Sequence, residues 1–383
     1  RFDINHPDHK SSIACLDRAI TISEIHHLTR EQFQAGTRKL DLYYLTGRIA
    51  EMEEMLKKSS DSLKSEVARN ISRYYNDNVH TPKRLDKAIE YANISLQASV
   101  AIKDVQRQMN AYNQLGYVYS QNGRLREAEN SYLESVKLSK TGKYEHVVQM
   151  YSFLARIASW RGNINRGIRY LMEALQYLGS QDDYAKPTIY ILLGKFYYDL
   201  NDYEKSMANL NIARPMVVKQ PDKYLPYSLA AAAARPLLKM GKPAEAKAIW
   251  VEALVDNPPV TPWMKFKMSL STGIINTALG NFELAENSLA ASLALSGNAA
   301  DSAEIEQAFA ELHFIKGEFA KSRDYLTMIF NKDVPASAQA AAHLLAFRAD
   351  SALRNFETAM ANLQKGKILS DSINAVERRN ELE

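Results

Sequence analysis

The segment LGYVYSQNGRLREAENSY, residues 115–132, decides the fold of this chain. A small residue, Gly116, is followed by a turn at Gly123, and a second small residue, Ala128, comes twelve positions after Gly116. Tyr132 lies four positions beyond Ala128, on the same face of a helix. Because glycine ends helices and small residues let two backbones approach, the segment predicts two helices that pack against each other across a short turn.

The same pattern recurs along most of the chain. The small residues at the place of Ala128 are Ala88, Ala128, Gly167, Ser206, Ala246, Ala285, Ser322 and Ala359. Their successive spacings are 40, 39, 39, 40, 39, 37 and 37 residues. Large residues follow four positions after five of them: Tyr132, Leu171, Leu210, Trp250 and Leu289. A fixed period of this length is the mark of a solenoid, so we expect an all-α array of helix-turn-helix units of about 37–40 residues each.

The repeat also sets the expected domain boundaries. Residues 1–63 lack clear small-residue anchors and are expected to form a degenerate N-terminal helical cap. Residues 64–370 are expected to form a solenoid of about eight repeats, and residues 371–383 the start of a charged C-terminal helix or linker. A chain of 383 residues would usually suggest several globular domains, because a single hydrophobic core stops growing beyond a certain size. A solenoid can be longer, because each repeat contacts only its neighbours.

Two of the units resemble the tetratricopeptide repeat family. In one, Leu115-Gly116-x-x-Tyr119 is followed by Gly123, Ala128 and Tyr132; the other has Leu193-Gly194, Leu210 and Ala213. The resemblance extends over roughly residues 64–370, with a period longer than the family's usual length of about 34. It implies a right-handed superhelical solenoid whose first helices line a concave groove, and a protein or peptide as partner.

Composition and motifs exclude several classes of function. A net charge of +4 is too small to indicate nucleic acid as a partner. The single cysteine, Cys15, excludes an internal disulfide and a cysteine-based zinc site. The chain has no phosphate-binding glycine loop, no nucleophile elbow and no His-Glu-x-x-His helix. We therefore expect no catalytic residue, no metal and no cofactor, and we interpret the chain as a non-enzymatic scaffold.

One row of residues is a candidate for ligand binding. At 100° per residue, the position just after each Leu-Gly pair points away from the face that packs on the second helix. Read along the units, this position holds Tyr117, Arg156, Lys195, Arg235 and Ile274. The resemblance implies that this side lines the groove, with neighbours Asn113, Ser152, Trp160 and Tyr198. Three consecutive cations would favour an acidic or carboxylate-ended partner; the alternative is that they are unrelated solvated charges.

The C-terminal segment suggests a place in a larger protein. Ser370-Asp371-Ser372-Ile373 leads into a charged run without turn residues, and this tail is similar to the sensory regions of bacterial tetratricopeptide-containing sensor histidine kinases. The resemblance implies the sensory input region of a two-component signalling protein, outside the cytoplasm (periplasmic), with any membrane segment outside this chain. The alternatives are a stand-alone cytoplasmic adaptor or co-chaperone and the repeat region of a transcriptional regulator. Ile373 and Val376, three positions apart, predict a helix that could pair two copies as a homodimer. Since the chain begins at Arg1, we expect it to be part of a longer protein.

Overall fold

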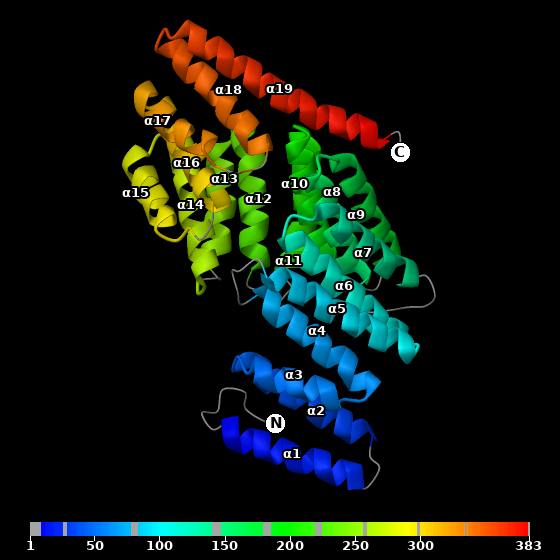
Figure 1. Cartoon of the computed structure of the whole chain (residues 1–383). Helices are drawn as coiled ribbons and strands as arrows, with labels where there is room; N and C mark the ends of the chain where they lie inside the picture. The colour runs from blue at the N-terminus through cyan, green and yellow to red at the C-terminus, as the bar shows by residue number, and fades with distance from the viewer. Residues whose placement is uncertain are drawn as a thin grey trace. The chain divides into compact units, whose positions relative to one another are not determined.

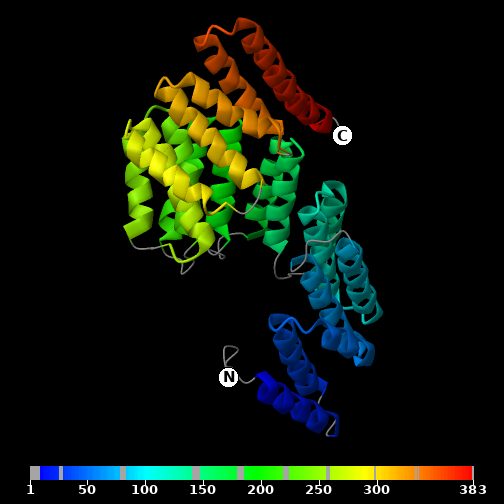
Figure 2. The ribbon, with the colours of Figure 1, turned by 60° about the vertical axis from the view of Figure 1, so that its left-hand side comes forward.

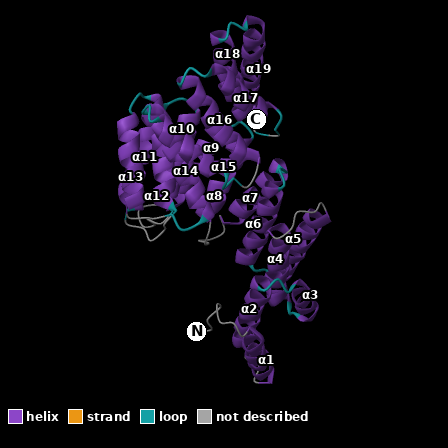
Figure 3. Ribbon diagram, turned by 90° about the vertical axis from the view of Figure 1, so that its left-hand side faces the viewer, coloured by secondary structure: helices purple, strands orange, loops and turns teal. Residues whose placement is uncertain are grey.

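The computed structural model describes residues 9–25, 29–77, 83–139, 147–178, 185–218, 224–255, 259–296, 299–332, 334 and 336–381. Within these ranges every regular element is an α-helix (Figure 3). The chain divides into two compact units, Arg1–Ile157 and Ala158–Glu383. The expected all-α architecture is therefore confirmed.

The described residues of unit 1 form seven helices and most of an eighth. These are α1 (His9–Ile25), α2 (Thr29–Leu45), α3 (Ile49–Lys58), α4 (Asp61–Asp77), α5 (Lys83–Ala101), α6 (Val105–Gln121), α7 (Leu125–Ser139) and the larger part of α8 (Val147–Trp160). The most extensive packing joins α4 to α5 and α6 to α7, and α1 packs on α2 (Figure 1). Unit 1 therefore contains antiparallel helix pairs preceded by the less regular α1–α3.

Unit 2 continues the helix pairs. Its helices after α8 are α9 (Ile164–Leu178), α10 (Lys186–Asp199), α11 (Tyr203–Val217), α12 (Leu225–Lys239), α13 (Pro243–Val255), α14 (Pro262–Ala278), α15 (Phe282–Leu293), α16 (Ala299–Ile315), α17 (Phe319–Phe330), α18 (Ala336–Ala352) and α19 (Phe356–Glu381). Each even-numbered helix from α10 to α18 packs most closely on the helix that follows it, and the first helices α10, α12, α14, α16 and α18 contact one another in sequence (Figure 2). α19 also contacts α9, so unit 2 curves back on itself.

The small residues of the repeat lie where the two helices of a pair touch. All eight, from Ala88 to Ala359, are buried. The glycines that precede them are needed for space, because a Cβ added to Gly194 would lie 2.5 Å from Leu210 Cγ. Gly116 stands in the same relation to the Tyr132 ring, at 2.7 Å. Small residues on one helix therefore accommodate large residues on the other, as the sequence predicted.

The tight turns inside the pairs use left-handed backbone. Gly123, Gly162, Gly241, Gly280 and Gly317 have φ between 72° and 80°. In two further turns the same conformation is taken by Asn201 (φ 60°) and Arg354 (φ 63°). Left-handed residues of this kind end a helix and reverse the chain within a few residues, which is what a helix-turn-helix unit requires.

Two features are absent from the described part of the chain. No helix there is long and apolar enough to cross a membrane. No group of three or more His, Cys, Asp or Glu side chains in the same residues could hold a metal ion.

Candidate ligand-binding pocket in the second unit

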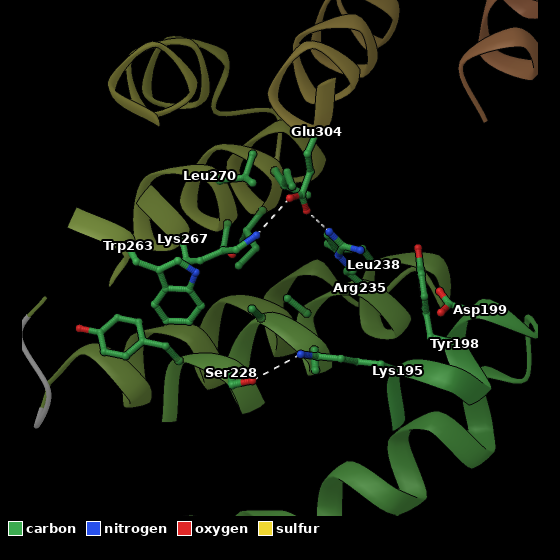
Figure 4. A pocket seen from close by; sticks show the side chains of 17 residues that line it. Lys195, Tyr198, Asp199, Ser228, Arg235, Leu238, Trp263, Lys267, Leu270 and Glu304 are labelled. Atoms are coloured by element: carbon green, nitrogen blue, oxygen red, sulfur yellow. Dashed lines mark hydrogen bonds and ion pairs between the residues drawn. The ribbon is translucent and has the colours of Figure 1, made fainter. Parts of the chain in front are cut away.

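The first helices of four successive pairs in unit 2 enclose a pocket. α10, α12, α14 and α16 contribute its walls, and its volume is about 360 Å³ (Figure 4). Alanines of α12, including Ala231 and Ala234, line part of it and leave the space open. A volume in the range of about 300–1,000 Å³ is typical of sites for small ligands or for a few residues of a peptide.

Cations from three of these helices face the pocket. Lys195 comes from α10, Arg235 from α12 and Lys267 from α14 (Figure 4). Glu304 of α16 forms ion pairs with both Arg235 and Lys267, with 3.1 Å between Lys267 Nζ and Glu304 Oε2. Lys195 Nζ lies 3.4 Å from Ser228 Oγ, to which it donates a hydrogen bond. The pocket thus has a cationic centre with one carboxylate held in it.

The electrostatics keep that carboxylate ionised. Burial raises the pKa of Glu304, but the neighbouring Arg235 and Lys267 lower it more, and the net result is a pKa below the usual value. The side chains are only partly covered, with exposed fractions of 28% for Glu304, 26% for Lys267 and 48% for Arg235. Water or a ligand can therefore reach the charged groups.

A second carboxylate, Asp199, behaves differently. It ends α10 next to Tyr198, and both line the pocket (Figure 4). Its side chain is exposed, yet the surrounding walls displace bulk water and raise its pKa to about 6, against the attraction of Arg235 and Lys195. Asp199 is thus largely ionised at pH 7 and takes up a proton as the pH falls through about 6, which leaves the cations of the pocket less fully neutralised in mildly acidic solution.

Aromatic side chains form the apolar part of the pocket. Trp263, at the start of α14, lines it and is 45% exposed, and its ring lies 5.8 Å from that of Tyr224. Tyr227 is a fully buried lining residue, supported by the edge-to-face ring of Trp250 at 6.2 Å. Aromatic surface beside cations suits a ligand that combines an apolar group with an anionic one.

Several residues of the predicted row lie in this pocket. Lys195, Arg235, Tyr198 and Ile274 all line it. Trp160, in α8, is 59% exposed and is not among the residues that line the pocket.

The other predicted residues lie in unit 1. Tyr117 donates a hydrogen bond from its hydroxyl to Asp77 at 3.1 Å. Arg156 lies 5.7 Å from the Phe153 ring, and burial lowers the pKa of its guanidinium. Asn113 has a buried amide oxygen with no hydrogen-bond partner among the described residues. Ser152 is buried, and its hydroxyl donates to the Val148 carbonyl of its own helix. The row as a continuous ladder from Arg156 to Arg235 stays a prediction.

Sequence reasoning missed Lys267, Glu304 and Trp263. Lys267 lies seven residues before Ile274, which is two helical turns earlier on the same face. Glu304 lies seven residues before Glu311, which follows Ala310 in α16 as Lys195 follows Gly194 in α10. The sequence therefore did indicate these positions. They lie on the same outward face of the first helices as the predicted row, but two turns earlier in the helix.

Comparison with known proteins agrees with this architecture. Residues 110–141 and 187–211 match the family model of the tetratricopeptide repeat. Two of the chain's helix pairs therefore match the tetratricopeptide repeat. The matched segments begin within the first helices α6 and α10 and extend into or just past their partners, so the structural pairs coincide with the tetratricopeptide units.

Solved structures with the same fold span nearly the whole chain. RapI in its apo form is 14% identical, with a TM-score of 0.64, over 84% of this chain and 96% of that one. NprR in complex with its cognate peptide NprX is 16% identical, with a TM-score of 0.55, over 98% and 100%. The Rap conjugation gene regulator of plasmid pLS20, in complex with the Phr* peptide, is 9% identical, with a TM-score of 0.59, over 87% and 96%. No curated protein matches the sequence. At these identities the likeness concerns the tetratricopeptide fold alone.

Proposed function

We propose that this chain is a non-catalytic scaffold that binds a protein or peptide through an acidic group held in the pocket of unit 2. The observation that carries the proposal is the convergence of Lys195, Arg235 and Lys267, from three successive first helices, beside the ring of Trp263. Cations on separate rigid helices cannot move apart freely, so their mutual repulsion favours an anion between them. Glu304 pairs with Arg235 and Lys267, and the three cations outnumber this one carboxylate, so the site attracts the anionic group of a ligand.

The solved structures support a peptide as the ligand class. NprR was crystallised with its cognate peptide NprX, and the pLS20 Rap regulator with the Phr* peptide. Another Rap protein, with a TM-score of 0.54 to this chain, was crystallised with the competence and sporulation factor. The same arrangement of helix pairs therefore holds peptides in other proteins, and the pocket described above offers this chain a site of suitable size and charge.

The C-terminal sequence suggests the kind of protein to which the scaffold belongs. We propose that the scaffold is the sensory input region of a bacterial signalling protein of the histidine kinase type, placed in the periplasm, with homodimers formed through the C-terminal helix. The support is the resemblance of residues 370–383 and the continuation of α19 to Glu381. The alternatives, a cytoplasmic adaptor or co-chaperone and the repeat region of a transcriptional regulator, use the same pocket and differ only in what is attached to it.

Binding of short acidic peptides tests the central proposal. Fluorescently labelled peptides rich in aspartate and glutamate, each with a lysine-rich counterpart of equal length, would be titrated with the full chain by fluorescence anisotropy. We expect the acidic peptides to bind, with an affinity that falls as salt is raised. Lys195→Glu should weaken binding by about tenfold or more, since a reversed charge replaces attraction with repulsion.

Lys247→Glu is the matched control. Lys247 is exposed on α13, a second helix, and does not line the pocket. The two substitutions change the net charge equally, so equal losses of affinity would show that binding follows overall charge and would refute the pocket as the site.

A further inference from the structure

We propose that Glu304 is a built-in occupant of the anion subsite, and that an acidic ligand binds by exchanging its carboxylate for that of Glu304. This inference rests on the proposed function and specifies how the site is regulated. Glu304 already holds the place where Arg235 and Lys267 converge (Figure 4).

The ion pairs show what the subsite recognises. Arg235 and Lys267 belong to different helices, α12 and α14, and they meet on one carboxylate that comes from a third helix, α16. The carboxylate of Glu304 is chemically the same group as the side chain of a ligand's aspartate or glutamate, or its C-terminus. Two cations arranged around one carboxylate are therefore matched in charge and geometry to the anionic end of a peptide.

Exchange is favoured over simple addition. With Glu304 in place, the charges of Arg235 and Lys267 are largely balanced, and a second carboxylate at the same point would be repelled by the ionised Glu304. Glu304 is 28% exposed, and its flexible side chain can turn outward into water at little cost. A ligand carboxylate would then take over both cations, and Lys195, bonded to Ser228 at 3.4 Å, would add further attraction.

The exchange would also release a connection within unit 2. α12 and α16 each pack on α14, which lies between them in the chain order of first helices. The Arg235–Glu304 ion pair links α12 directly to α16 past α14. When a ligand replaces Glu304, this link is lost, so occupancy of the pocket is coupled to how firmly the pair α16–α17 is held against its predecessors.

Titration of the full chain with glutarate tests the exchange. Glutarate is a dicarboxylate with the chemistry of the Glu304 side chain, and its binding can be followed by the fluorescence of Trp263, which lines the pocket. Glu304→Gln keeps the size of the side chain and removes its charge. We expect it to bind glutarate about tenfold more tightly than the unmodified chain, because no internal carboxylate has to be displaced. Trp263→Phe should remove most of the fluorescence change, which would assign the signal to the pocket.

Glu252→Gln is the matched control. Glu252 forms an ion pair with Arg214 between the second helices α13 and α11, away from the pocket. The same substitution at this place should leave glutarate affinity unchanged. Thermal unfolding followed by circular dichroism would verify that both variants are folded, and Glu304→Asp, which shortens the side chain while keeping its charge, should give an intermediate gain in affinity if Glu304→Gln is too unstable to use.

A second measurement needs no variant. Saturating glutarate should increase amide hydrogen exchange in the first half of α16, where Glu304 lies, and should leave α6 in unit 1 unchanged as an internal reference. Slower exchange in α16 would contradict release of the link.

The outcomes separate the two proposals. If acidic peptides and glutarate bind, and Glu304→Gln binds them equally or more weakly, then exchange is wrong while the pocket remains the ligand site. If neither probe binds the unmodified chain or Glu304→Gln, the proposed function itself fails, and the exchange fails with it.

Discussion

Replacing Trp250 by alanine should destabilise unit 2 more than any exposed substitution. Trp250 is 3% exposed, packs edge-to-face on Tyr227 at 6.2 Å, and donates a hydrogen bond from its indole nitrogen to Thr272 Oγ1 at 3.1 Å. Removal of a buried tryptophan costs about 3–5 kcal/mol, because the lost transfer energy is joined by the cost of the cavity. The aromatic pair, worth about 0.5–1.5 kcal/mol, lies within that range. We expect a loss of about 4 kcal/mol in the free energy of unfolding.

The assay is urea denaturation followed by circular dichroism, with Trp160→Ala as the matched control. Trp160 is 59% exposed, so its removal should change the free energy by no more than about 0.5 kcal/mol. Since repeats couple mainly to their neighbours, the transition of Trp250→Ala should also broaden or split. A loss below about 1 kcal/mol with an unchanged sharp transition would refute the assignment of Trp250 as the anchor between its neighbouring helices.

Three further predictions concern the turns, the close helix contacts and the pocket. Gly194→Ala should cost about 1–3 kcal/mol in urea denaturation because the new Cβ would lie 2.5 Å from Leu210 Cγ, and a favourable coupling with Leu210→Ala in a double-mutant cycle would verify the cause. Arg354→Gly should stabilise the chain by about 0.5–1 kcal/mol because φ at this position is 63°, whereas Gly317→Ala, at φ 78°, should destabilise it; a lower thermal midpoint for Arg354→Gly would contradict this. Asp199 has a pKa raised from 3.8 to about 6 in the folded state, so its ionisation opposes folding. The resulting loss in the free energy of unfolding is absent below pH 3.8 and complete above about pH 6. The advantage of Asp199→Asn over the unmodified chain in urea midpoint should therefore grow as pH rises through this window. An advantage independent of pH would show that the surrounding pocket walls do not shift the pKa of this carboxyl.

Much of the fold could be predicted from the sequence because every repeat has the same local requirements for its turn and for the contact between its two helices. At each turn a residue such as Gly123 or Asn201 must adopt positive φ, and at each contact a residue such as Gly194 must leave room for Leu210. These requirements act between residues close in sequence, so a single chain reveals them. Trp250 could be assigned as a packed anchor for the same reason, since it occupies in its repeat the position that Tyr132 and Leu210 occupy in theirs.

The pocket could be predicted only in part. Lys195 and Arg235 were found because they occupy equivalent positions in successive units, and both line the pocket. Glu304 pairs with Arg235 across 69 residues, a contact that depends on the curvature of unit 2 and on the length of two side chains. Asp350 illustrates the same limit elsewhere: it is 2% exposed and accepts hydrogen bonds from Arg323 and Asn362, on two other helices, and nothing in the repeat pattern indicates such a buried polar network.

The two faces of each first helix explain why the residues of the proposed binding site lie on the first helices. One face of each first helix is committed to its partner by small residues such as Gly194 and Ala234, and any charge there would be buried without a partner. The opposite face does not pack against the second helix of the pair, so it can carry Lys195, Arg235 or Lys267 without disturbing the pair. Curvature then brings four such faces together around one pocket. Three of them carry cations, which repel one another unless an anion lies between them. In the free chain that anion is Glu304, whose ion pair with Arg235 spans two repeats. If a ligand supplies the carboxylate instead, as we propose, this ion pair between repeats is broken, and ligand binding is then coupled to how firmly the pair α16–α17 is held.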